Sequence, residues 1–312
     1  MLPPVLLTRR IPSSVFRTLE AACDVDLYDG PGAIPQDELK TRVKGKRALL
    51  CLLTDPVNAD VLDAGDKLEI VANIAVGYNN IDVAHAKRQG IVVTNTPDVL
   101  TEAVAEFTWG LIFAAGRRIC EGDRLVRSGD WKGWALDFML GMELRGKQLG
   151  IVGRGRIGRA VAAKAPAFGM SVVFAAKPGA LPRDDERSLD ELLVSSDVVT
   201  LHVPQTAATQ HLIDKKALAR MKRSAILVNT ARGQIVDEEA LGWALRERLI
   251  AGAALDVYEN EPAVHPSLLG LETVVVAPHL GSATRDTRTA MAALAVRNVL
   301  AVLDGDAPIT PV

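Results

Sequence analysis

Short apolar runs alternate with stretches of helical spacing along the first hundred residues of the chain. Runs rich in Val, Ile and Leu and bounded by turn residues predict strands, here at 5–8, 24–28, 47–54, 68–75 and 90–96. Strands that alternate with helices in this way are typical of a parallel sheet. A helical pattern without proline then runs from Thr101 to Arg118 and leads into a loop with two tryptophans, which we interpret as the passage between two domains.

A second series of strands and helices follows the tryptophan loop. Strands are predicted near 148–152, 171–175, 197–203, 225–230, 252–257 and 273–277. The last helical pattern, from about Ser282 to Leu303, has no strand after it. We therefore expect this helix to pack on the N-terminal domain, which makes that domain discontinuous in sequence.

The first strand of the second series ends in a glycine motif. Residues 148–158 read QLGIVGRGRIG, a strand followed by GxGxxG and the start of a helix, and 171–176 supply the next strand. Gly153 permits a tight turn, Gly155 lets the backbone approach a pyrophosphate, and Gly158 lets helix and strand pack closely. The motif predicts a dinucleotide site, also lined by Arg154, Arg156 and Ile157; the alternative is a glycine-rich turn that binds no ligand.

Composition and charge narrow the classes of partner. The 312 residues are 48% hydrophobic and carry a formal net charge of −2. A basic surface for nucleic acid or anionic lipid is therefore not expected, and the expected partners are small molecules or another subunit. Cys23, Cys51 and Cys120 are widely spaced and form no CxxC pair, which is typical of free thiols in a reducing compartment. No signal core, membrane-length run or metal-ligand spacing is found, so we expect a cytoplasmic protein without a metal.

Three polar side chains follow three strands of the second series: Arg232, Glu261 and His279. Because ligands bind outside the carboxyl ends of parallel strands, we expect all three at one crevice. An arginine can hold a carboxylate or polarise a carbonyl, and a histidine can donate a proton while a nearby glutamate favours its protonated form, so the set suits carbonyl reduction. The alternatives are a structural Arg232–Glu261 ion pair and a helix-capping role for His279.

Further polar or small residues stand at the same strand ends. Asp256, within an apolar strand, is a buried carboxylate that can accept a hydrogen bond from a nicotinamide amide, or else pair with a loop amide or with Arg232. His202 ends another strand and is expected near the adenine end of the cofactor. The remaining expected cofactor contacts are Pro204, Thr230, Ala231 and Gly281.

Six motifs follow one another along the chain: VGYNNIDV (76–83), NTPDVLTEAVAEFTWGLI (95–112), GKQLGIVGRGRIG (146–158), NTARGQIVDEEAL (229–241), GAALDVYENEP (252–262) and APHLGSAT (277–284). In their order, and over nearly the whole chain, they resemble the D-2-hydroxyacid dehydrogenase family. The resemblance implies an α/β fold of two doubly wound parallel-sheet domains: a Rossmann dinucleotide-binding domain over 101–283 and a flavodoxin-like substrate domain over 1–100 and 284–312. It also implies a homodimer, and the family's catalytic arginine, glutamate and histidine fall on Arg232, Glu261 and His279.

The end of the second strand of the dinucleotide-binding unit predicts which cofactor is used. An acidic residue is expected there to hold the ribose 2′-hydroxyl of NAD, but the position holds Ala176 followed by Lys177. Lys177 can attract a 2′-phosphate, together with Arg154 or Arg183, so NADPH is expected over NADH, with NAD still possible. The alternative is that Lys177 faces solvent and either cofactor serves.

Within the family the chain most resembles glyoxylate/hydroxypyruvate reductases, through LLTDPV (52–57), the WKGW loop and GSAT. The resemblance gives the substrate carboxylate to the backbone of Val76 and Gly77, an apolar wall to Leu52, and a reach into the neighbouring subunit's site to Trp134. Trp134 can instead be dimer packing. Other interpretations are a phosphoglycerate dehydrogenase, which usually carries a further regulatory region, and a co-repressor that senses the cofactor without turnover.

Overall fold

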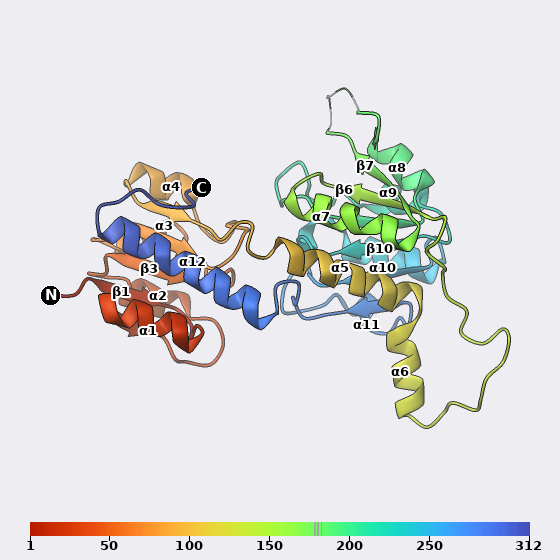
Figure 1. The fold of residues 1–312 in the computed structure, drawn as a ribbon, viewed down its shortest axis with the longest axis horizontal. Helices are drawn as coiled ribbons and strands as arrows, with labels where there is room; N and C mark the ends of the chain where they lie inside the picture. The colour runs from red at the N-terminus through yellow and green to blue at the C-terminus, as the bar shows by residue number, and fades with distance from the viewer. Residues whose placement is uncertain (178, 180, 182) are drawn as a thin grey trace. The chain divides into compact units, whose positions relative to one another are not determined.

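The computed structural model describes residues 1–177, 179, 181 and 183–312. The chain divides into two compact units, the first formed by Met1–Leu100 with Ala283–Val312 and the second by Thr101–Ser282. Each unit has one parallel β-sheet with helices against it (Figure 1). The α/β fold class predicted from the alternating strands and helices is therefore confirmed.

The sheet of the first unit has five parallel strands in the order β2-β1-β3-β4-β5. Its three central strands are buried throughout or nearly so, because both of their faces are covered, which explains why the sequence shows continuous apolar runs instead of alternation. The strands span Pro4–Leu7 (β1), Asp24–Leu27 (β2), Ala48–Cys51 (β3), Ile70–Asn73 (β4) and Val92–Thr94 (β5).

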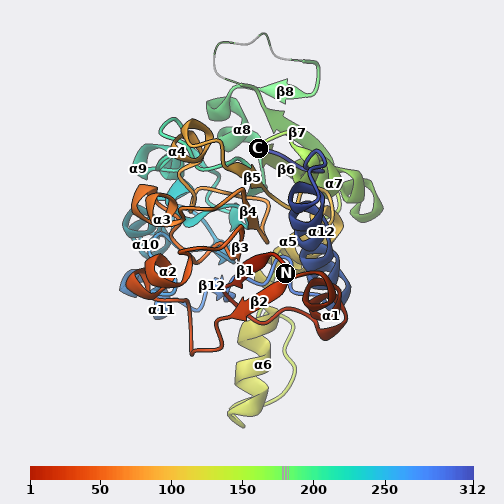
Figure 2. The ribbon, with the colours of Figure 1, turned by 90° about the vertical axis from the view of Figure 1, so that its left-hand side faces the viewer.

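Helices cover both faces of this sheet. Figure 2 shows α1 (Ser13–Ala22) and α12 (Arg285–Leu303) on one face, and α2 (Gln36–Arg42), α3 (Ala59–Ala64) and α4 (Val83–Arg88) on the other. The helix α12 packs on α1, β3 and β4. The chain end continues along β5, where the backbone N–H of Val312 donates to the Val93 carbonyl at 3.0 Å. The last thirty residues are thus part of this sheet's packing.

The sheet of the second unit has seven parallel strands in the order β12-β11-β10-β9-β6-β7-β8. Six match the predicted strands, while β8 was missed because two charged residues carry no hydrophobic pattern. The order reverses between β6 and β9, and such a switch point opens a crevice at the carboxyl ends of the strands. The strands span Gln148–Val152 (β6), Ser171–Ala175 (β7), Glu186–Arg187 (β8), Val198–Leu201 (β9), Ile226–Asn229 (β10), Gly252–Leu255 (β11) and Val274–Val276 (β12).

The two faces of the seven-stranded sheet carry separate apolar cores. One core packs against α5 (Thr101–Gly116) and α7 (Arg156–Lys164), and the other against α8 (Leu189–Ser195), α9 (Lys215–Arg220) and α10 (Glu238–Arg246). The remaining helical segments are α6 (Ile119–Arg127), α11 (Pro266–Leu269) and the 3₁₀ turns Ala165–Phe168 and Gly233–Ile235.

The helix predicted from Thr101 to Arg118 corresponds to α5, which ends at Gly116, and a second helix, α6, follows it. Arg118 has a positive φ of 54° and separates α5 from α6. Helix α6 and the tryptophan loop after it (129–147) extend away from the rest of the seven-stranded unit (Figure 1). Across the described residues, no helix is both long and apolar enough to span a membrane.

Candidate active site

The loop after β10 carries Arg232. Asn229, the last residue of β10, holds this loop from its side chain: its Oδ1 accepts from the Ala231 N–H at 3.0 Å and its Nδ2 donates to the Arg232 carbonyl at 2.8 Å. The guanidinium donates to the Ala231 carbonyl at 2.6 Å. Burial lowers the pKa of Arg232, and the negative charge of Glu261 opposes this, so the carboxylate offsets part of the cost of burying the cation.

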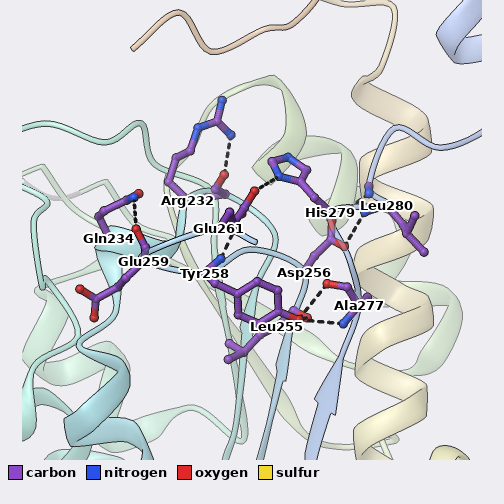
Figure 3. Close-up of polar contacts among 12 residues, drawn as sticks. Arg232, Gln234, Leu255, Asp256, Tyr258, Glu259, Glu261, Ala277, His279 and Leu280 are labelled. Atoms are coloured by element: carbon purple, nitrogen blue, oxygen red, sulfur yellow. Dashed lines mark hydrogen bonds and ion pairs between the residues drawn. The ribbon is translucent and has the colours of Figure 1, made fainter. Parts of the chain in front are cut away.

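Glu261 and His279 form a hydrogen-bonded pair next to Arg232. Figure 3 shows the Glu261 side chain between Arg232 and His279. One carboxylate oxygen lies 2.8 Å from Nδ1 of His279, and the other accepts from the Tyr258 N–H at 3.1 Å. Burial acts to raise the pKa of Glu261, but the bond and charge of His279, the Tyr258 N–H and the charge of Arg232 outweigh it and lower that pKa. Because a carboxylate only accepts, Nδ1 of His279 carries a proton and Nε2 is the nitrogen left for a substrate.

Asp256 anchors the turn that carries His279. Its two carboxylate oxygens accept from the N–H groups of Leu280 at 2.6 Å and Gly281 at 2.8 Å, and its own carbonyl accepts from the His279 N–H at 2.9 Å. His279 has a positive φ of 54°, a conformation this turn enforces. Burial raises the pKa of Asp256, and the two backbone bonds oppose it. Of the alternatives for this carboxylate, pairing with loop amides is present in the structure.

The helix-capping alternative for His279 is wrong. The residue that caps α12 is Thr284, whose hydroxyl accepts from the Thr287 N–H at 3.1 Å.

The glycine motif has the geometry of a phosphate cradle. Gly153 has a φ of +112°, and a Cβ added there would lie 2.4 Å from the His202 carbonyl oxygen at the end of β9. A Cβ on Gly158 would lie 2.0 Å from the Gly153 carbonyl oxygen, so both positions require glycine. Gly155 is the N-cap of α7, and a Cβ there would have no atom within 4 Å. The open space at a helix N-terminus fits a dinucleotide pyrophosphate, and Arg156 and Ile157 are the first residues of that helix.

The end of β7 is more acidic than the sequence count predicts. Ala176 is half-buried and Lys177 is exposed there. Arg154 lies over the Phe174 ring at 4.5 Å and forms ion pairs with Asp185 at 2.6 Å and Glu186 at 3.3 Å, while Arg183 lies 4.0 Å from Glu186. These carboxylates were missed because they come some ten residues after the expected position, on or beside the short strand β8.

The other predicted cofactor contacts lie at the same edge of the sheet. His202 follows β9 and its Nε2 lies 3.0 Å from the Thr200 hydroxyl; burial lowers the pKa of His202 to about 3, so this ring is neutral at physiological pH. Pro204 follows on the same loop, and the Thr230 hydroxyl lies 3.0 Å from that of Thr108 on α5. Within the described ranges, no group of three or more His, Cys, Asp or Glu side chains is placed to hold a metal ion.

The predicted substrate-binding residues other than Arg232 and His279 lie elsewhere in the chain. Leu52, Val76 and Gly77 follow strands of the five-stranded unit, and the carbonyls of Val76 and Gly77 accept from the side-chain amides of Asn95 and Asn73, both at 2.8 Å. Trp134 belongs to the tryptophan loop and is 81% exposed. Neighbouring apolar side chains of the loop are exposed as well: Trp131 at 53%, Leu136 at 82%, Phe138 at 42% and Leu140 at 67%.

Comparison with known proteins defines the class. The model of the D-isomer specific 2-hydroxyacid dehydrogenase NAD-binding domain matches residues 109–281. The chain belongs to this family and is an NAD(P)-dependent D-2-hydroxyacid dehydrogenase. The enzymatic interpretation is thus confirmed.

Individual proteins of this family are similar to the chain over nearly its whole length. The glyoxylate reductase of Thermococcus kodakarensis is 46% identical over 99% of this chain and 96% of its own length, and that of Korarchaeum cryptofilum is 47% identical over 99% and 95%. The crystal structure of an NADPH-dependent glyoxylate/hydroxypyruvate reductase from Sinorhizobium meliloti, in complex with NADP and malonate, is 34% identical with a TM-score of 0.88 and covers 100% of this chain and 97% of that one.

Proposed function

We propose that the chain reduces small 2-oxo acids, glyoxylate to glycolate and hydroxypyruvate to D-glycerate, with NADPH as the preferred donor and His279 as the proton donor. The observation that carries the proposal is the Glu261–His279 pair at 2.8 Å beside Arg232. The printed names of the relatives, glyoxylate reductase and glyoxylate/hydroxypyruvate reductase, support the choice of substrate.

Each of the three side chains has one task in this mechanism. When bound, the nicotinamide supplies a hydride to the substrate carbonyl carbon. Arg232 holds the substrate's carboxylate and carbonyl oxygen and stabilises the negative charge that develops on that oxygen. His279 donates its Nε2 proton to the same oxygen. Glu261 holds Nδ1 and stabilises the imidazolium before the transfer.

The residues around the cradle would hold the dinucleotide. Gly153, Gly155 and Gly158 with the start of α7 receive the pyrophosphate, and we assign contacts along the rest of the cofactor to His202, Pro204, Thr230, Ala231, Asp256 and Gly281. Each oxygen of Asp256 accepts one backbone bond and keeps a second lone pair, which suits it to accept from the nicotinamide amide.

The preference for NADPH rests on the cations beside β7. Lys177 is exposed and Ala176 offers no carboxylate to a ribose hydroxyl. Arg154 is a second cation here, but its ion pair with Asp185 must break before it can bind a 2′-phosphate. A relative bound to NADP supports the assignment.

For the substrate side, we assign the carboxylate to the N–H groups of Val76 and Gly77 and the apolar wall to Leu52. The Val76 carbonyl shares a peptide with the Gly77 N–H and accepts from the Asn95 side chain at 2.8 Å, and the Ala75 carbonyl shares a peptide with the Val76 N–H and accepts from the Thr96 N–H at 2.8 Å, so both peptides are held in place. The exposed apolar side chains of the tryptophan loop support a homodimer, because a patch of this kind marks an interaction surface. Three free cysteines support a cytoplasmic location.

The first experiment follows NAD(P)H absorbance with purified protein, glyoxylate or hydroxypyruvate, and either NADPH or NADH. Faster oxidation of NADPH than of NADH supports both parts of the proposal. Turnover with NADH alone would keep the enzyme and remove the role of Lys177, and no turnover with either acid would reject the substrates. In a Trp134→Ala variant, an unchanged ratio of the two acids would assign Trp134 to packing alone.

A further inference from the structure

Three segments of the seven-stranded unit meet behind the Arg232 and Glu261 loops. They are 211–214, 232–238 and 258–265, and they are joined by His211, Glu238 and Glu259, which we call the carboxylate clasp. Glu238, the first residue of α10, is 3% exposed. Burying carboxylates is costly unless each is fully hydrogen-bonded, so this arrangement requires a compensating set of donors.

The clasp supplies those donors by a reciprocal exchange. One oxygen of Glu238 accepts from the Glu259 N–H at 2.8 Å, and one oxygen of Glu259 accepts from the Glu238 N–H at 2.9 Å. The second oxygen of Glu238 accepts from the His265 N–H at 3.0 Å, and that of Glu259 lies 3.0 Å from Nε2 of His211. Asp237 caps α10 by accepting from the Ala240 N–H at 2.9 Å, and Glu259 adds to this cap, because the Glu238 N–H is another group at the helix start without an intrahelical partner.

The clasp is tied to both catalytic loops. Glu259 is two residues before Glu261, and its side chain points away from the Glu261–His279 pair (Figure 3). Its carbonyl accepts from the Gln234 side chain at 2.7 Å, two residues after Arg232. Gly233, between Arg232 and Gln234, packs against the backbone of Tyr258, and a Cβ added to it would lie 1.8 Å from the Tyr258 carbonyl carbon. The separation of Arg232 from Glu261 is thus fixed by packing and by hydrogen bonds.

We propose that Glu259 and Glu238 are positioning residues that hold the Glu261 carboxylate against His279 and in register with Arg232. Neither contacts the reacting groups; both act through the loop that carries Glu261. The inference rests on the proposed function for its kinetic test, but the geometry it concerns can be measured without turnover.

The kinetic test compares Glu259→Ala with Glu239→Ala, a neighbour of Glu238 that is exposed on α10. We expect Glu259→Ala to lower kcat by roughly 10- to 100-fold, the scale of an ångström-level misplacement, with the KM for NADPH unchanged. Glu239→Ala should match the unmodified enzyme. Glu259→Gln, which keeps the acceptor for the Glu238 N–H, should recover most of the lost rate.

A double variant separates positioning from a general loss of structure. If Glu259 acts through Glu261, then Glu259→Ala should lower kcat far less in the Glu261→Gln background than it does in the unmodified enzyme. Losses that multiply, or a kcat unchanged in Glu259→Ala, would overturn the inference. If Glu259→Ala does not fold, Glu259→Asp, too short to reach the Glu238 N–H, replaces it.

An NMR measurement tests the positioning role of Glu259 without a measurement of enzyme activity. The Nδ1–H proton of His279, assigned by its loss in His279→Asn, should give a downfield signal in the unmodified protein that broadens or shifts in Glu259→Ala. A signal unchanged in Glu259→Ala would reject the clasp as a positioning device. Absence of turnover in the unmodified protein would reject the proposed function and leave this result standing.

Discussion

Acidification should destabilise the seven-stranded unit through His202. The pKa of this ring is lowered by burial to about 3, against an ordinary value of 6.5. Between these values the unfolded chain binds a proton that the folded chain excludes, so stability falls as pH drops below the unfolded value. Linkage gives a loss of about 2 kcal/mol in the free energy of unfolding between pH 7 and pH 5. The size of this loss is set by the pKa of His202 in the unfolded chain, because at pH 5 the ring in the folded protein binds almost no proton.

The assay is guanidinium unfolding at pH 7, 6 and 5, followed by tryptophan fluorescence. All four tryptophans lie within Thr101–Ser282, so the signal reports on the unit that contains His202. His202→Gln cannot take up the proton, and the difference in unfolding free energy between it and the unmodified protein should change by about 2 kcal/mol across this range. His85→Gln, in the five-stranded unit, is the control. Parallel pH dependences for the unmodified protein and His202→Gln would refute the reasoning.

Three further predictions concern the site. His279→Asn should lower kcat about 10²- to 10⁴-fold while NADPH still binds, measured by turnover and cofactor fluorescence; a small loss would assign the proton to another donor. Lys177→Ala should lower the NADPH to NADH ratio of kcat/KM about tenfold, and Asp185→Asn should raise this ratio by removing the shorter of the two ion pairs of Arg154; opposite signs would contradict the cofactor assignment. Gly153→Ala should lower the free energy of unfolding by about 2 kcal/mol or more, whereas Gly155→Ala should cost under about 1 kcal/mol in denaturant unfolding and raise the KM for NADPH instead.

The strands and the grouping of the three candidate site residues could be predicted because each carries a local signal. Apolar runs such as ILVN and GAAL are buried on both faces of their sheet, and the polar residue after each run lies at its carboxyl edge. The parallel sheet then brings Arg232, Glu261 and His279 to one edge without further information.

What the sequence does not reveal depends on contacts between distant segments. Glu238 and Glu259 read as surface charges in DEEAL and YENEP, and only the fold shows that each carboxylate caps the other's backbone. The Arg154–Asp185 pair joins residues 31 positions apart through β8, a strand too short to have a pattern. Gly116 ends α5, but the positive φ of Arg118 before α6 has no signal in the sequence.

The place of α12 sets an order of events during synthesis. The seven-stranded unit is one continuous stretch and has its whole sheet once residue 282 has left the ribosome. The five-stranded sheet begins at residue 4, yet one of its faces is only partly covered by α1 until residues 285–303 are made, and β5 gains its last backbone bond from Val312. The first strands made are therefore among the last to be fully covered, and the N-terminal segment must stay soluble while the rest of the chain is translated.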